Sequence, residues 1–348
     1  MRLGIIGLPQ SGKKTIFKTI IRLRSDKEIE ISSPPDPTIA TITIFDDRLK
    51  FLSKLFNPKK TVFLKMEYFL PAEISTSIKS EKSIWNQVRT CDGLIHIIRN
   101  FELLEGSPPD PERDFWSLEE EMILSDLMVV EKRIEKIKSD ISRGKKSKEL
   151  EKELQLLSMC RDILEKGESL RQHADMINNS MLKGFTFLSV KPMLLVINNE
   201  EDINSIPIWK KAPSFLRIVS VRGRLEFELS QMNEEESKEF KELYDLKSFS
   251  IDKIVKESFT ILNKITFFTA GDKEVRAWTI DNGATALDAA GEIHSDMKKG
   301  FISAEVISFE DLKRCGSILE AKKLGILRLE GKDYIVKDGD IITFRFNV

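Results

Sequence analysis

The sequence has few cysteines and no long apolar run. Its three cysteines, Cys91, Cys160 and Cys315, lie far apart, and none belongs to the C-x-x-C spacing of redox pairs and metal sites. This scarcity excludes a disulfide-stapled secreted domain and favours a reducing compartment. No apolar stretch approaches the ~20 residues that cross a bilayer. The first ten residues reach a glycine at position 4, too early for a signal-peptide core. We therefore expect a cytoplasmic protein that is neither exported nor embedded in a membrane.

An excess charge of either sign is also missing. The 55 Lys and Arg residues balance 56 Asp and Glu residues, so no global positive field attracts nucleic acid or an anionic membrane. We therefore expect no sequence-specific DNA binding and no membrane partner. Glycine and proline number only 17 and 12 among 348 residues, and hydrophobic residues make up 41%. These values exclude collagen-like and disordered chains and predict two or three globular domains.

Alternating strand and helix patterns follow from the N-terminus. A short apolar run at residues 3–6 precedes a glycine-bearing loop and then a segment with helical periodicity. Further buried-strand patterns occur at 93–98, 193–198 and 216–221, separated by polar, helix-like stretches. This alternation predicts an α/β fold with a parallel sheet covered by helices on both faces.

Two segments depart from this pattern: one interrupts it and the other follows it. Between residues 117 and 170 apolar residues recur in steps of four and three, which predicts an antiparallel helical hairpin that begins with a capping box at Ser117 and Glu120. Its tip is basic, and either a solvated turn or a phosphate-contacting tip fits the residues Arg143, Lys145, Lys146 and Lys148. From residue 265 the chain becomes rich in strands and turns, which predicts a compact α+β module with its boundary near Lys264.

The loop after the first strand has the pattern of a phosphate-binding loop. Gly7 is followed after four residues by Gly12 and Lys13, between a predicted strand and a predicted helix. Backbone N–H groups of such a loop surround phosphate oxygens, and the lysine neutralises their charge. The complete signature continues with Ser or Thr, whose hydroxyl binds Mg²⁺, but this chain has Lys14 there. Thr15 stands one residue later, about 100° around the helix, so we expect weakened Mg²⁺ binding.

The chain resembles the YchF family of Obg-like ATPases over essentially its whole length. The resemblance rests on the loop GLPQSGKKT and on the C-terminal segments FFTAG, KEVRAWTI, GATALDAAG and LRLEGKDYIVKDGD. It implies a P-loop NTPase domain at residues 1–116 and 171–264, an inserted coiled-coil hairpin at 117–170, and a ubiquitin-like TGS domain at 265–348. It also implies that ATP is preferred over GTP. The implied partner is the ribosome or a translation factor, contacted through the TGS domain and the hairpin.

The resemblance also assigns site residues. The implied phosphate-binding residues are Gly7, Pro9, Gln10, Ser11, Gly12, Lys13, Lys14 and Thr15, and Thr15 is the candidate metal ligand. The implied base-binding residues are Asn198, Glu201, Arg222 and Gly223. A carboxylate after a strand accepts a hydrogen bond from an exocyclic amine, and an amide both donates and accepts. An ordinary polar strand end is the alternative interpretation of residues 198–201.

The departures from the family concentrate on catalysis. Leu70 stands where the family has the Asp of the metal shell, Glu73 where it has the Gly that meets the γ-phosphate, and Pro34 near its switch threonine. Because phosphoryl transfer depends on metal, positioning and electrostatics, these losses predict impaired or very slow hydrolysis and leave no catalytic residue to name. Two alternatives stay open: a working but slow Mg-dependent ATPase or GTPase, and a nucleotide-free adaptor. His96, His173 and His294 are interpreted as structural.

Overall fold

The computed structural model describes residues 1–24, 37–72, 84–145, 147–177, 179–203, 205–244, 246 and 249–347. The chain forms two compact units. Unit 1 consists of Met1–Ile42 and Glu67–Ile261, and unit 2 consists of Thr43–Met66 and Leu262–Val348. Within the described ranges, no helix is both long enough and apolar enough to span a bilayer.

Unit 1 is built on a six-stranded sheet in the order β2-β4-β1-β5-β6-β7. Its strands are β1 (Arg2–Ile6), β2 (Thr38–Ile44), β4 (Leu64–Leu70), β5 (Gly93–Asn100), β6 (Met193–Asn199) and β7 (Arg217–Val221). The pairs β4–β1, β1–β5, β5–β6 and β6–β7 are parallel, as the sequence predicts. Strand β6 is buried along its whole length because both faces of the sheet are covered.

Several helices of unit 1 lie outside the inserted hairpin. They are α1 (Lys13–Arg24), α3 (Ile84–Val88), α7 (Gly223–Leu229), α8 (Glu234–Leu243) and α9 (Ser250–Ile261). Helix α1 packs on α7 and α9, and α9 also contacts β6 and β7. These contacts place the start of α1 and the start of α7 at the same edge of the sheet, where β1, β6 and β7 end.

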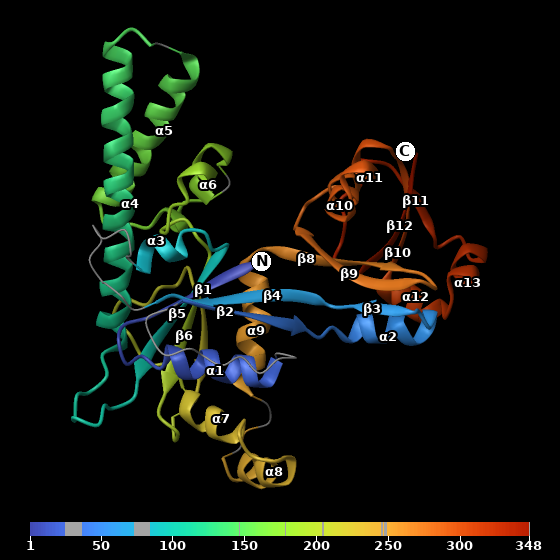
Figure 1. The fold of residues 1–348 in the computed structure, drawn as a ribbon, viewed down its shortest axis with the longest axis horizontal. Coiled ribbons are helices and arrows are strands. Elements are labelled where there is room, and N and C mark those ends of the chain that lie inside the picture. The colour runs from blue at the N-terminus through green and yellow to red at the C-terminus, as the bar shows by residue number, and fades with distance from the viewer. Residues whose placement is uncertain are drawn as a thin grey trace. The chain divides into compact units, whose positions relative to one another are not determined.

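The inserted hairpin consists of α4 (Pro111–Ser142) and α5 (Lys148–Glu165), which Figure 1 shows as two long neighbouring helices. The predicted capping box at Ser117 is wrong as a helix start. The helix begins earlier because Asp110 caps it, accepting from the Arg113 N–H, and a proline occupies the first helical position. The predicted apolar seam is present. Val130, Ile134 and Ile137 of α4 share one buried cluster with Leu157 and Leu164 of α5.

Buried carboxylates anchor the base of the hairpin. Glu119 of α4 pairs with Arg171 through bonds of 2.5 and 2.7 Å, and both side chains are buried. Asp126 accepts hydrogen bonds from the backbone N–H groups of Leu188 and Ser189. The chain between these contacts forms the short elements η1 (Leu170–Gln172), α6 (Ala174–Ile177) and η2 (Ser180–Phe185). Satisfied buried charges of this kind fix the position of a helix, because breaking one pair leaves the other charge buried and unpaired.

At the hairpin tip, one of the basic residues has an acidic partner. The Lys145 ammonium lies 3.1 Å from a carboxylate oxygen of Asp140. The carboxylate is held by this bond, and the pKa of Asp140 falls below its usual value. Lys146 lies outside the described residues. The pairing reduces the net positive charge that the tip presents.

Unit 2 contains a second six-stranded sheet, in the order β11-β10-β12-β8-β9-β3. Its strands are β3 (Lys60–Val62), β8 (Lys264–Ala270), β9 (Glu274–Asp281), β10 (Phe301–Ser308), β11 (Arg328–Glu330) and β12 (Asp340–Phe346). Its helices are α2 (Asp47–Phe56), α10 (Ala286–Ile293), α11 (Ser295–Lys299), α12 (Phe309–Cys315) and α13 (Ile318–Lys323). Two apolar clusters lie on the sheet, one beneath α10 and one beneath α2, α12 and α13.

An early segment of the chain completes unit 2. Strand β3 pairs in parallel with β9, and Leu49 and Leu52 of α2 are fully buried in one cluster with Phe268. Figure 1 shows β3 and α2, coloured blue, next to the orange β9. The predicted C-terminal module begins at residue 265, whereas the compact unit also includes residues 43–66.

Candidate functional site

The loop between β1 and α1 has a conformation that requires glycine at position 12. Gly12 has a φ of 87°, and a Cβ placed on it would lie 2.2 Å from Nδ2 of Asn198. Both facts exclude a larger residue there. The next residue, Lys13, is only 4% exposed, and its Nζ donates to the carbonyl oxygen of Leu8 at 3.1 Å. The ammonium therefore lies across the loop.

The other predicted phosphate-loop residues divide between rim and interior. Pro9 and Gln10 are exposed, and Gln10 adopts a left-handed φ of 63°. Ser11 is buried, its N–H donates to the Leu8 carbonyl, and its hydroxyl has no hydrogen-bond partner among the described residues. Lys14 is exposed and Thr15 is half-buried in the first turn of α1. The loop thus presents two adjacent lysines with different environments.

Asn198 joins the two sequence motifs. Its Nδ2 donates to the Ser11 carbonyl at 3.1 Å, and its Oδ1 accepts from the Gly223 N–H at 3.0 Å. The approach is so close that a Cβ on Gly223 would lie 2.6 Å from Oδ1 of Asn198. The side chain is buried at the end of β6. Residues far apart in the sequence are therefore brought together at the carboxyl edge of the sheet, where α/β folds bind ligands.

Arg222 and Glu201 differ in how they are placed. The buried Arg222 guanidinium donates to the carbonyl oxygens of Glu201 and Tyr244, at 3.4 and 3.1 Å. It therefore holds neighbouring loops in place. The Glu201 side chain is 33% exposed, and its carboxylate lies 3.6 Å from the guanidinium of Arg224. Of the predicted base-binding side chains, Glu201 is the one at the rim.

Two residues that no sequence motif indicates also shape this region. Glu226 is buried in α7 and accepts from the backbone N–H of Ile251, which ties α7 to the start of α9. Burial raises the pKa of the Glu226 carboxyl, although hydrogen bonds to it act in the opposite direction. Phe101 follows directly after β5, and its ring edge lies 4.0 Å from the position of a Cβ on Gly12. The position of Phe101 after a strand at the carboxyl edge is the signal that could have identified it.

The residues at the two positions where the family holds its metal do not fit a Mg²⁺ site. Magnesium takes oxygen ligands in octahedral geometry. At the two positions implied as ligands the chain has Lys14, which offers an ammonium, and Leu70, which is aliphatic and 5% exposed at the end of β4. Across the described ranges no three His, Cys, Asp or Glu side chains lie together as a metal-binding group. Glu73 and Pro34 lie outside the described residues.

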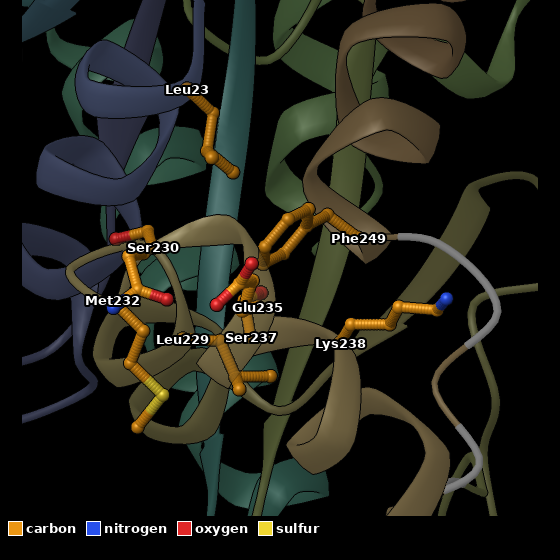
Figure 2. Close-up of a pocket in the computed structure, with 9 residues that line it drawn as sticks. Leu23, Leu229, Ser230, Met232, Glu235, Ser237, Lys238 and Phe249 are labelled. Atoms are coloured by element: carbon orange, nitrogen blue, oxygen red, sulfur yellow. The ribbon is translucent and has the colours of Figure 1, made fainter.

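A separate pocket of about 610 Å³ lies at the other end of α1 (Figure 2). Its wall includes Leu23, Leu229, Met232 and Phe249, together with polar side chains of α8. A twelve-residue helix is about 18 Å long, so this pocket lies well away from the first turn of α1. No predicted site residue lines it. The phosphate loop and Asn198 are therefore the candidate site.

Known proteins resemble the chain along nearly its full length. A Bacillus subtilis protein named ribosome-binding ATPase YchF is 34% identical over 363 residues, covering 99% of both chains. A Mycoplasma genitalium protein of the same name is 33% identical over 368 residues, again covering 99% of both. The chain belongs to the YchF family. The predicted family is thus confirmed.

A solved structure confirms that this chain has the fold of the YchF family. The Schizosaccharomyces pombe YchF GTPase matches with a TM-score of 0.82 and 25% identity, over 99% of this chain and 97% of that one. Residues 264–347 also match the family model YchF-GTPase_C, which is described as a protein of unknown function. The predicted fold class is correct: a P-loop NTPase sheet domain with an inserted helical hairpin and a C-terminal α+β domain.

Proposed function

We propose that this YchF-family chain binds purine nucleotides and prefers ATP to GTP. The observation that carries the proposal is the Asn198 side chain, which connects the Ser11 carbonyl of the phosphate loop with the N–H of Gly223. A phosphate-binding loop and a strand-end motif joined in this way form one continuous surface for a nucleotide. Glu201 at its rim offers a carboxylate acceptor for the exocyclic amine of adenine.

Hydrolysis by this chain is impaired or very slow. The transition state of phosphoryl transfer is stabilised mainly by positioning and by charge. A buried leucine at position 70 offers no ligand oxygen, and Lys14 offers none in the first turn of α1. We expect turnover well below the ~1 s⁻¹ low end of ordinary enzymes. Lys13→Ala is the control that separates any residual activity from a contaminant.

The chain acts on the ribosome or on a translation factor, and therefore in the cytoplasm. The support is the name of its relatives, ribosome-binding ATPase YchF, at 33–34% identity. The TGS domain and the hairpin are the surfaces proposed for this contact. Cosedimentation with ribosomes tests it, and a chain that stays in the supernatant at low salt contradicts it.

Calorimetric titration with ATP, GTP and ADP tests the nucleotide proposal. We expect tighter binding of ATP than of GTP, and Glu201→Ala should remove most of that preference. Asp202→Ala is the matched control because it removes an exposed neighbouring carboxylate. Equal or tighter binding of GTP by the wild-type chain contradicts the selectivity. No binding of any nucleotide favours the adaptor alternative, and rapid Mg-dependent turnover favours the working enzyme.

A further inference from the structure

The start of α1 is unusually cationic for a helix that carries no acid. Its first turn contains Lys13 and Lys14 and no acidic residue, and Lys18 follows one turn later, whereas Arg22 and Arg24 lie in the last turn. The helix N-terminus adds partial positive charge from its unpaired N–H groups. The protein therefore supplies at this place the positive charge that a metal ion supplies in other nucleotide sites.

The two lysines of the first turn occupy different positions. Lys13 is buried and reaches over the loop to the Leu8 carbonyl, which is the place of a phosphate-binding lysine. Lys14 is exposed on the next residue, at the position where the motif has the metal-binding hydroxyl. An ammonium at a metal-ligand position repels a divalent cation and attracts the same phosphate oxygens.

The second position implied for the metal, residue 70, is apolar. Strand β4 pairs with β1 in parallel with Phe69 opposite Gly4, so Leu70 lies next to the strand that leads into the phosphate loop. This side chain is almost completely buried. The leucine side chain at this position offers no carboxylate to hold the waters of a hydrated metal ion. The side chains at positions 14 and 70 thus both disfavour the metal.

We propose that the chain binds the metal-free nucleotide polyphosphate, with the Lys14 ammonium in place of the divalent cation. The inference rests on the proposed nucleotide binding and specifies the form of the ligand. The metal-free polyphosphate carries more negative charge than its Mg²⁺ complex, and Lys14 together with Lys13 compensates it. Free Mg²⁺ then acts as a competitor, because it withdraws the form of the nucleotide that binds.

Titration calorimetry with ATP in EDTA and in excess Mg²⁺ tests this inference. We expect the wild-type chain to bind ATP more tightly in EDTA. Lys14→Ser should weaken binding in EDTA by about tenfold and should strengthen binding in Mg²⁺, so that the order of the two conditions reverses. Lys18→Ser is the matched control, because it removes an exposed lysine of the same helix one turn further on. It should leave the order of the conditions unchanged.

The outcomes separate this inference from the proposed function. Wild-type binding that requires Mg²⁺ overturns the inference and leaves nucleotide binding in place, and loss of that binding in Thr15→Ala would assign the metal to Thr15. Equal effects of Lys14→Ser and Lys18→Ser in EDTA also overturn it, because Lys14 then acts only through general charge. Absence of ATP binding in both conditions contradicts the proposed function itself.

Discussion

At the scale of single residues, Asn198 is the side chain on which the candidate site depends. Both polar atoms of its amide bond backbone groups that belong to different motifs. The neighbouring glycines, Gly12 and Gly223, have no Cβ that would collide with this amide. The pattern of the loop and the pattern after β6 each predict a site separately, whereas their connection through one buried amide is a feature of the folded chain.

Asn198→Ala should destabilise unit 1 as well as weaken nucleotide binding. The change leaves the Ser11 carbonyl and the Gly223 N–H buried without a partner, which costs about 1–3 kcal/mol of unfolding free energy for each unsatisfied group. Urea denaturation measures the loss. Asn282→Ala in unit 2, at an exposed position, is the control. An unchanged denaturation midpoint for Asn198→Ala would show that water satisfies both groups.

His96 should make stability depend on pH. It is fully buried in β5 against Phe115, and neither ring nitrogen has a hydrogen-bond partner in the part of the chain that the structure describes. Burial, aided by the charge of Arg171, lowers the pKa of His96 to about 3. Between the unfolded pKa of about 6.5 and this value only the unfolded chain takes up the proton. Stability therefore falls as the pH falls through this window.

The pH effect of His96 is separable from that of the carboxylates. The His96 contribution approaches about 1.4 kcal/mol per pH unit below the unfolded pKa. Urea denaturation of the wild-type chain and of His96→Leu between pH 7 and pH 5 measures it, because all other groups titrate equally in both proteins. The raised pKa of Glu226 works in the opposite direction, since its contribution to stability is lost as the pH rises. Parallel pH profiles of the two proteins would mean that the buried imidazole has a hidden partner.

At the scale of elements, the hairpin combines a self-contained upper part with an anchored base. Arg133 and Glu153 pair across the two helices through two hydrogen bonds of 2.7 and 2.8 Å. Below them Glu119 and Asp126 bind the chain that returns from the hairpin. The heptad pattern predicts the seam, but it carries no information on the carboxylates of the base, which sit at single positions within an ordinary charged helix.

Removal of the upper hairpin should leave unit 1 folded. Replacing residues 134–152 with a short Gly/Ser linker keeps Glu119, Asp126 and their partners, and it removes apolar residues that pack mainly on each other. We expect cooperative unfolding and unchanged nucleotide affinity, checked by denaturation and calorimetry. The matched variant Arg171→Ala keeps the hairpin but breaks its anchor, and it should destabilise the chain by about 3–5 kcal/mol. If the deletion variant is less stable than Arg171→Ala, the apolar contacts of the upper hairpin contribute more to stability than the anchor does.

At the scale of the whole molecule, residues 43–66 belong to the same compact unit as the C-terminal residues. Leu49 and Leu52 of α2 are fully buried there, and β3 extends the sheet beside β9. A fragment that begins near residue 264 would therefore lack the cover over Phe268, Ile307 and Ile341.

The isolated fragment 262–348 should be less stable than the same fragment fused to residues 43–66 through a flexible linker. The missing helix leaves apolar surface exposed, and each leucine that it buries contributes about 1.5–3 kcal/mol. Thermal unfolding and binding of a hydrophobic dye compare the two. A control fusion that carries Leu49→Ser and Leu52→Ser should behave like the bare fragment. Equal stability of the bare and fused fragments would show that the C-terminal residues form a complete domain.

The sequence by itself determines those features of the protein that depend on neighbours along the chain. Local periodicity and turn chemistry predict three such features. They are the strand, phosphate loop and helix at residues 1–24, the apolar seam of the hairpin, and the strand-rich segment after residue 264. Substitutions at ligand positions, such as Lys14 and Leu70, are likewise evident from residue identity. The sequence thus determines the chemical character of the site.

Only the tertiary structure decided which distant groups meet. Four features depend on contacts between segments far apart in the chain. They are the hydrogen bonds of Asn198, the bonds from the Arg222 guanidinium to backbone carbonyls, the burial of Glu226, and the membership of residues 43–66 in unit 2. No local pattern encodes these contacts, because the sequence neighbours of a buried polar residue do not show which distant segment supplies its hydrogen-bond partner. Burial makes such partners obligatory, and packing of the whole chain selects them.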